Sequence, residues 1–325
     1  MKFNKGIVFS LSTIFLTCFL SNQAIAEYPE KEVKIIVNYG VGGGVDRTAR
    51  SIQRFLPDDL GATVLVENHK GAGGKIGYKQ YLKQKKDMYN ILCAFIPALT
   101  NVGVKNPGLV DLNDLAFINV QWSDPALLVA HKDAPFNTLK EMIEEVRKNP
   151  GKYSFSIGGQ GAVGYLLSNM MFKELGLKIN MVPYASGGKS RAAIQGGHVQ
   201  LTAAGAGTML SIKDEIKPLA LFWDKPNQEW PGAILANSVL KEYNVTIPDG
   251  AAYRFFAVSA EAKEKYPEDF KKLVAAFKKT TTENKGFSEF TDKTKVSRDW
   301  YGPEKSTEIL IQAHQRFNKM LKAAK

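Results

Sequence analysis

Short apolar segments alternate with amphipathic ones along most of this chain, and this alternation restricts the fold more than any other feature. The first series predicts strands at residues 33–39, 62–68 and 89–95, with helices at 46–60 and 76–85 between them. Parallel strands need crossovers that cover both faces of their sheet. The series therefore predicts an α/β unit with a mostly parallel sheet flanked by helices.

The same alternation starts again in the middle of the chain. Strands are predicted at 126–131, 153–158, 179–184, 199–205, 216–223 and 252–259, and helices at 139–148, 163–175, 189–195, 267–281 and 304–324. The apolar face of the last helix is expected to cover the first sheet. We therefore predict two α/β lobes, lobe 1 from residues 27–125 and 251–325 and lobe 2 from residues 126–250. Two chain crossings between them would form a hinge.

Residues 1–26 have the pattern of a secretory signal peptide. Lys2 and Lys5 precede an apolar run, and the run is followed by an A-x-A cleavage site at 24–26. We expect cleavage there and a periplasmic protein that starts near Glu27. An uncleaved anchor is the alternative, but the apolar run is shorter than the ~20 residues that a spanning helix needs.

Charge and cysteine content exclude several classes of function. The predicted mature chain holds 41 of the 43 lysines and arginines and all 32 acidic residues, a formal charge of +9. Such an excess suits nucleic acid, an anionic surface or an anionic solute. The basic residues are spread along the chain without a nucleic-acid-binding motif, so no nucleic-acid partner is predicted. Cys93 is the one cysteine after residue 26, which leaves no intramolecular disulfide.

The sequence offers no catalytic, metal or cofactor motif. The four histidines lack the spacing of a zinc site, and no G-x-S-x-G elbow occurs. Gly187 to Ser190 resemble the end of a P-loop, but Pro183 stands where its first glycine is required. The first glycine run also lacks the dinucleotide-binding spacing. We therefore predict no catalytic residues, no metal and no cofactor.

Glycine-rich loops follow several of the predicted strands. Three lie at 38–46, 67–77 and 156–165, and a fourth lies at 183–190. At the carboxyl ends of parallel strands, helix N-termini direct free N–H groups into a crevice that suits an anion. The alternative is that the glycines only form tight turns. Asp46 is interpreted as an N-cap that fixes the first loop.

Four motifs carry a resemblance to a known family. They are "YPEKEVKIIVNYGVGGGVD", "VLVENHKGAGGKIG", "NPGKYSFSIGGQG" and "VPYASGGKSRAAIQGGHVQ", and they span Tyr28 to about Leu201 in order. The sequence resembles the periplasmic receptors of tripartite tricarboxylate transporters, also called Bug receptors. The resemblance implies a two-lobed Venus-flytrap protein that captures a small carboxylate, with a di- or tricarboxylate favoured. It would deliver this solute to a membrane permease as a monomeric, non-enzymatic receptor.

In that family, the loops matching 39–46 and 157–165 clasp one carboxylate through backbone amides and bridging waters. The candidate ligand-binding residues are Tyr39, Gly40, Val41, Gly42, Gly43, Gly44, Asp46, Ile96, Ala98, Gly158, Gly159, Gln160, Gly161, Ala162, Tyr184, Ala204 and Arg254. Several depart from the family pattern. Ala162 replaces a serine, Ala204 replaces a polar residue, and residues 95–98 replace small hydroxyl and glycine residues.

Arg254 stands where the family often has a glycine. Its guanidinium is expected either to extend to solvent or pair with a structural acid, or to bind a second carboxylate of the ligand. Two other functions stay open at this point. One is a sensor that presents its solute to a membrane kinase. The other is an exported enzyme using Asp46, His69 or Lys189, although their spacing suggests no nucleophile with an adjacent base.

Overall fold

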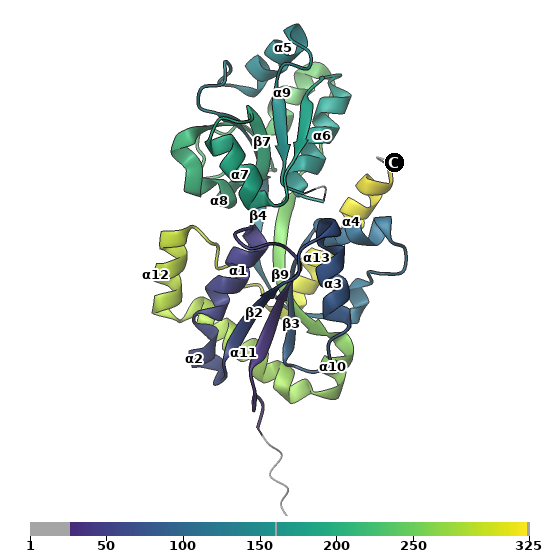
Figure 1. Cartoon of the computed structure of the whole chain (residues 1–325), viewed down its shortest axis with the longest axis vertical. Helices are drawn as coiled ribbons and strands as arrows, with labels where there is room; N and C mark the ends of the chain where they lie inside the picture. Colours follow the sequence, from purple (N-terminus) through teal and green to yellow (C-terminus); the bar gives the residue numbers. More distant parts are fainter. Residues whose placement is uncertain (1–26, 160, 324–325) are drawn as a thin grey trace, which may run out of the picture.

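The computed structural model describes residues 27–159 and 161–323, and it consists of two α/β lobes joined at a narrow waist (Figure 1). The predicted signal peptide, residues 1–26, lies outside the described residues. Among the described residues, no helix is both long enough and apolar enough to cross a membrane.

Lobe 1 is built on a sheet with the strand order β2-β1-β3-β9-β4. Its strands are β1 (Val33–Val37), β2 (Val64–Asn68), β3 (Asn90–Ile96), β9 (Ala251–Ser259) and the first part of β4 (Leu115–His131). The helices that cover it are α1 (Gly44–Gln53), α2 (Leu56–Leu60), α3 (Lys75–Leu82), α4 (Ala98–Lys105), α10 (Ala260–Lys265), α11 (Pro267–Thr282), α12 (Lys285–Thr294) and α13 (Gly302–Ala323).

Lobe 2 is built on a sheet in which β4 pairs with β7 and β8, and β7 continues to β5 and β6. Its further strands are β5 (Ser154–Ile157), β6 (Asn180–Pro183), β7 (Leu201–Gly205) and β8 (Ile216–Phe222). Its helices are α5 (Leu139–Lys148), α6 (Val163–Glu174), α7 (Gly187–Gln195), α8 (Ala206–Met209) and α9 (Ala236–Leu240).

The long strand β4 belongs to both sheets. Its residues up to Pro125 pair with β9, and from Ala126 onward it pairs with β7 and β8. Among the described strands, every antiparallel pair involves β4 or β9, and the other pairs are parallel. In each sheet four of the five described strands run in the same direction, with β9 the exception in lobe 1 and β4 the exception in lobe 2, so the predicted mostly parallel sheets are confirmed. The residue limits predicted for the lobes stay a prediction.

Most predicted elements appear within a few residues of their expected positions, and the differences have local causes. The single helix predicted at 46–60 is two helices, because Pro57 lacks an N–H and restricts Leu56, and it fits only in the first turn of α2. The first half of β4 was not predicted. Its apolar pattern is interrupted by buried polar residues such as Asn119, Gln121 and Asp124.

The apolar face of α13 packs at the waist, against the strands that lie between the two lobes. Leu310, Ala313 and Phe317 are buried in a core cluster with residues of β4 and β9, and Met320 packs against the same cluster. The helix packs on β4 and α4. Its contacts thus support the strand segments that connect the two sheets.

Candidate functional site

The loop between β1 and α1 is held by the carboxylate of Asp46. This carboxylate accepts a hydrogen bond from the Gly42 N–H (2.9 Å), one from Arg50 Nε (2.9 Å) and one from Asn68 Nδ2 (2.9 Å). The prediction that Asp46 is the N-cap is wrong, because the N-cap is Gly43 and Asp46 lies in the first turn of α1. From inside the helix, its carboxylate reaches back to the Gly42 N–H of the loop. Asp46 fixes the loop and is buried.

Gly43 leaves the N-terminus of α1 without a side-chain cap. The first N–H groups of a helix have no partner within the helix, and they carry the positive end of its dipole. The N-terminus of α6 in lobe 2 has the same character, because its N-cap Ala162 offers no side-chain hydrogen bond. Two uncapped helix N-termini, one from each lobe, therefore lie beside the glycine-rich loops.

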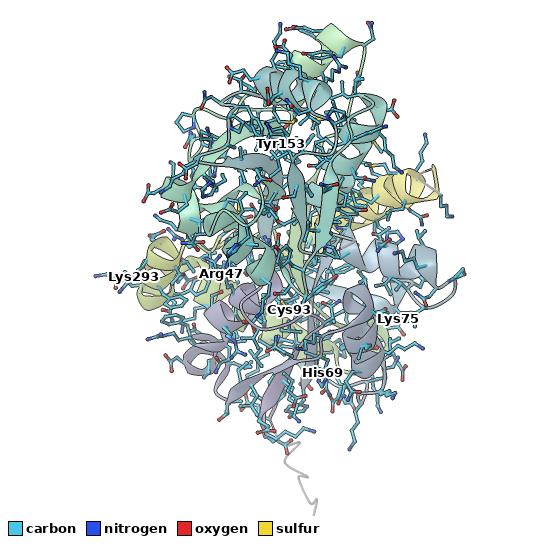
Figure 2. All side chains as sticks on the ribbon, turned by 45° about the horizontal axis from the view of Figure 1, so that its top comes forward. Arg47, His69, Lys75, Cys93, Tyr153 and Lys293 are labelled. Carbon is cyan, nitrogen blue, oxygen red and sulfur yellow. The ribbon has the colours of Figure 1, made fainter. Side chains whose placement is uncertain are left out.

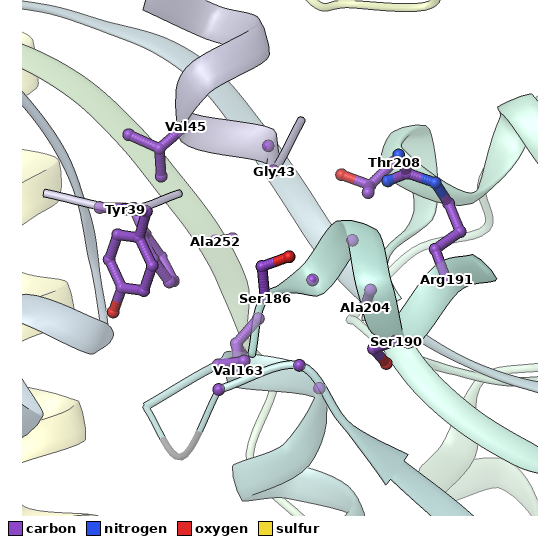
Figure 3. Close-up of a pocket in the computed structure, with 18 of the residues that line it drawn as sticks. Tyr39, Gly43, Val45, Val163, Ser186, Ser190, Arg191, Ala204, Thr208 and Ala252 are labelled. Carbon is purple, nitrogen blue, oxygen red and sulfur yellow. The ribbon is translucent and has the colours of Figure 1, made fainter. Parts of the chain in front are cut away.

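These loops line a cavity of about 100 Å³ between the lobes (Figure 3). Of the predicted site residues, those in its wall are Tyr39, Gly40, Gly43, Gly44, Gly158, Gly159, Ala162, Ala204 and Arg254. Further wall residues that the prediction did not include are Val45, Phe95, Val163, Gly164, Ser186, Gly187, Ser190, Arg191, Ala203, Gly205, Thr208, Met209 and Ala252. Helix N-termini and an arginine-containing wall suit a small anion.

A second cavity of about 370 Å³ adjoins the first. The two share Tyr39, Gly40, Gly158 and Gly159, and the second extends to Lys70, Asn101, Asn106 and the predicted site residue Tyr184. The interlobe cleft therefore continues beyond the small cavity on the side of α4.

The remaining predicted site residues lie elsewhere. Val41 is exposed, Asp46 and Ile96 are buried outside both cavity walls, and Gln160 lies outside the described residues. Gly42, Ala98 and Gly161 also line neither cavity, but they lie where the lobes touch. The structure thus separates residues that line the cavities from the residues of the interlobe contacts, Gly42, Ala98 and Gly161, which form the rim of the cleft.

The lobes are in contact at two places in the loops beside the small cavity. A Cβ atom at Gly161 of lobe 2 would lie 2.9 Å from Ala98 Cα of lobe 1. A Cβ atom at Gly188 of lobe 2 would lie 3.2 Å from the Gly42 carbonyl oxygen of lobe 1. Glycine at these two positions allows the backbones to approach closely. The arrangement is a closed one.

Arg254, on β9, both lines the cavity and pairs with an acid. Its Nη1 donates to Asp124 Oδ2 (3.0 Å), its Nη2 donates to Thr208 Oγ1 (3.0 Å), and its guanidinium lies 4.1 Å from the Trp122 ring centroid. Pairing with a structural acid was one of the two expectations for this residue. Two of its nitrogens are therefore already engaged, which reduces the donors left for a ligand.

Two further arginines were missed in the sequence. Arg191 of α7 lines the cavity, and Figure 3 shows its guanidinium end directed toward Thr208. Arg47 of α1 lies near the waist (Figure 2), with its guanidinium 5.8 Å from the Trp122 ring centroid. Both lie within the first five residues of a helix, where the dipole disfavours a cation. That unfavourable placement beside glycine-rich loops is the signal that could have identified them.

The residues of the enzyme alternative do not assemble into a catalytic group. Asp46 is engaged by Arg50 and Asn68, His69 Nε2 lies 3.5 Å from Glu67, and Lys189 is exposed. Cys93 is buried, and burial raises the pKa of its thiol. Among the described residues, no group of three or more histidine, cysteine, aspartate or glutamate side chains could hold a metal ion.

Comparisons with known proteins agree with this geometry. The model of the tripartite tricarboxylate transporter family receptor matches residues 48–324. The protein BugT of Bordetella pertussis is 30% identical over 193 residues. That match covers 58% of this chain and 58% of BugT, so the aligned region spans just over half of each protein.

Solved structures with the same fold cover nearly the whole chain. The periplasmic binding protein BugD is 25% identical, with a TM-score of 0.75 over 91% of this chain and 98% of BugD. MatC from Rhodopseudomonas palustris, solved with bound malate, is 18% identical. Its TM-score is 0.76 over 90% of this chain and 100% of MatC. These likenesses establish a two-lobed periplasmic binding protein fold.

Proposed function

Because the chain belongs to the tripartite tricarboxylate transporter receptor family, we propose that it is an extracytoplasmic receptor for a small carboxylate. It binds the solute between its lobes and delivers it to a membrane permease of the tripartite type. The observation that carries this proposal is the cavity between two uncapped helix N-termini, one on each lobe. One carboxylate there can receive N–H groups from both lobes, so binding and closure are coupled.

The size of the cavity favours a short solute. An engineered cavity of about 150 Å³ takes benzene, so a cavity of about 100 Å³ favours the shortest dicarboxylates over longer ones. The malate bound by MatC is a short dicarboxylate of this kind. The adjoining cavity of about 370 Å³ gives room for a longer chain. A di- or tricarboxylate is therefore the proposed solute class.

The protein is proposed to act as a receptor without catalysis and as a periplasmic monomer after cleavage of residues 1–26. Its wall offers backbone amides, small side chains and arginines, and the one carboxylate that is bonded to a wall hydroxyl among the described residues, Asp124 beside Thr208, is already engaged by Arg254 and the Gly207 N–H. We also propose that lobe 1 comprises residues 27–125 and 251–325 and lobe 2 residues 126–250. The change of β4 pairing partners between Pro125 and Ala126 supports this limit.

Native mass spectrometry of protein purified from its host tests this proposal. We expect an added mass that matches a small di- or tricarboxylate and that is lost when the protein is denatured. Titration calorimetry with the identified compound then gives its affinity and stoichiometry. A bound solute without a carboxylate, or chemical conversion of the compound by the protein, would contradict the proposed function.

A further inference from the structure

Three guanidinium groups gather where the lobes meet. Arg47 and Arg254 belong to lobe 1, and Arg191 belongs to lobe 2. Arg191 and Arg254 line the small cavity, whereas Arg47 and Arg254 both lie over the ring of Trp122. A closed cleft thus brings a cation of lobe 2 against two cations of lobe 1.

Only one of these cations has an acidic partner. Asp124 accepts from Arg254 Nη1, and in the described part of the chain no carboxylate lies within 4.0 Å of the Arg47 or Arg191 guanidinium. Two of the three guanidinium groups therefore have no carboxylate in direct contact among the described residues. Burial and the neighbouring arginines lower the pKa of Arg47 to about 10, so its charge persists at neutral pH.

The hydrogen bonds of Arg47 and Arg191 are also incomplete. Arg47 Nη2 donates to the carbonyl oxygens of Thr294 and Lys295, and Arg191 Nη2 lies 3.5 Å from the Gly42 carbonyl oxygen. The Nη1 atom of each is buried and has no hydrogen-bond partner among the described residues. A buried donor on a charged group costs free energy when it is unpaired, and like charges in a low-dielectric site repel. Closure is therefore opposed unless negative charge enters the cleft.

We infer that Arg191 binds the second negative group of the solute, which gives this arginine a counter-charge and holds the lobes closed. This inference rests on the proposed function, because the first carboxylate is assigned to the helix N-termini. A second negative group would supply Arg191 with a direct counter-charge, which a solute with one negative group at the helix N-termini does not supply. The second group is a carboxylate or a phosphonate, since both accept hydrogen bonds from a guanidinium.

The test compares three probes that differ in their second group: succinate, 3-phosphonopropionate and butyrate. Each is titrated by calorimetry at pH 7 into the wild-type protein, the Arg191→Gln variant and the Lys189→Gln variant. Lys189 is a matched control, because it lies on the same helix but is exposed and outside both cavity walls. Both variants lose one positive charge, so a general effect of net charge appears in both.

We expect wild-type protein to bind succinate or 3-phosphonopropionate more tightly than butyrate. Arg191→Gln should weaken the dianion by about 10- to 100-fold, as for a charge-assisted hydrogen bond, and change butyrate little. Lys189→Gln should leave all three affinities within about twofold of the wild type. The dianion that binds more tightly identifies the second group as carboxylate or phosphonate.

Scattering adds a readout that does not depend on affinity. At saturating dianion, the wild-type radius of gyration should fall, whereas Arg191→Gln should stay closer to its value without dianion. Equal losses for dianion and butyrate, or no loss for either dianion, would overturn the inference while the proposed function stands. Equal wild-type affinity for butyrate and both dianions would also overturn the inference alone, whereas a bound solute without a carboxylate in native mass spectrometry would overturn both the inference and the proposed function.

Discussion

At the scale of single residues, the cleft glycines fall into two groups. A Cβ atom at Gly164 would lie 2.4 Å from the carbonyl carbon of Ala203, and one at Gly44 would lie 2.6 Å from Arg254 Nε. At Gly159, in contrast, a Cβ atom would meet nothing within 4 Å. Gly159 lines both cavities, so a side chain there enters the space of the solute without disturbing the fold.

Gly159→Val should therefore separate binding from folding. We expect the affinity for the solute to fall by about 5- to 150-fold, which corresponds to the ~1–3 kcal/mol cost of overfilling a packed site. The midpoint of thermal unfolding should change little. Calorimetric titration and a thermal melt measure the two effects, with Gly232→Val on the exposed surface of lobe 2 as the control. Normal binding by a folded Gly159→Val protein would show that this loop is only a turn.

The sequence allowed the glycine loops to be recognised, because glycine is informative wherever a strand ends. The placement of Arg47 and Arg191 near helix N-termini sets them apart among the 43 basic residues, but it does not show that they lie in the cleft. Their importance depends on the absence of an acidic partner in three dimensions, and a linear pattern does not contain that information. Asp124 was missed for the same reason, since it pairs with Arg254 across 130 residues of sequence.

At the scale of elements, β4, β9 and α8 are tied together at the waist by one buried network. Asp124 of β4 accepts from the Gly207 N–H (2.8 Å), from Thr208 Oγ1 (2.7 Å) and from Arg254 Nη1 of β9 (3.0 Å). The side chain of Asp124 is 1% exposed and that of Arg254 is 7% exposed. No larger side chain fits at Gly205, where a Cβ atom would lie 1.8 Å from Asp124 Oδ2.

Removing Asp124 should strongly destabilise the protein. Asp124→Ala leaves Arg254 buried beside two other arginines without its carboxylate, and breaking a buried pair in this way costs about 3–5 kcal/mol. Arg254→Ala should cost less, because Asp124 keeps its hydrogen bonds from Gly207 and Thr208. Urea unfolding of both variants and the double variant measures these costs. A loss below about 1 kcal/mol for Asp124→Ala would contradict the structural role of the network.

Elements with regular apolar periodicity were predicted well. Helix α5 occupies the predicted residues, Leu139–Lys148, because its apolar positions repeat at helical spacing and Thr138 caps it. Strand β4 was predicted only from Ala126 onward. Its first half pairs with β9 and carries buried polar residues that bond to distant segments, such as Asn119 to Asp299. Polar residues satisfied by distant partners hide a strand from pattern-based prediction.

At the scale of the whole molecule, the two-lobed fold followed from the alternation of strands and helices, and the structure and its relatives confirm it. The closed arrangement did not follow, because it depends on contacts between lobes. Those contacts lie at glycines of the loops beside the cavity, and among the described strands β4 alone belongs to both sheets. Such an architecture suits rigid-body closure about a hinge.

Enlarging a rim residue should block closure without removing the binding groups. Gly161→Val places a side chain against Ala98 of the other lobe, where even a Cβ atom would lie at 2.9 Å. Small-angle scattering should show a smaller radius of gyration on ligand binding for the wild type and little change for the variant. The control is Gly232→Val, which leaves the rim intact. Full compaction of Gly161→Val would place the contact between lobes elsewhere.

The shared strand also determines the order in which the chain can fold. Residues 126–250 contain all the strand residues of the lobe 2 sheet. They begin with the second part of β4, which pairs with β7 and β8, and they continue through β5 to β8. The lobe 1 sheet needs β9, which is synthesised more than 100 residues after β3. Pairing over such sequence separations slows folding, because the entropy of closing the loop must be lost before the contacts form. Lobe 2, although it lies in the middle of the chain, can therefore complete its sheet before lobe 1, whose N-terminal strands wait for β9.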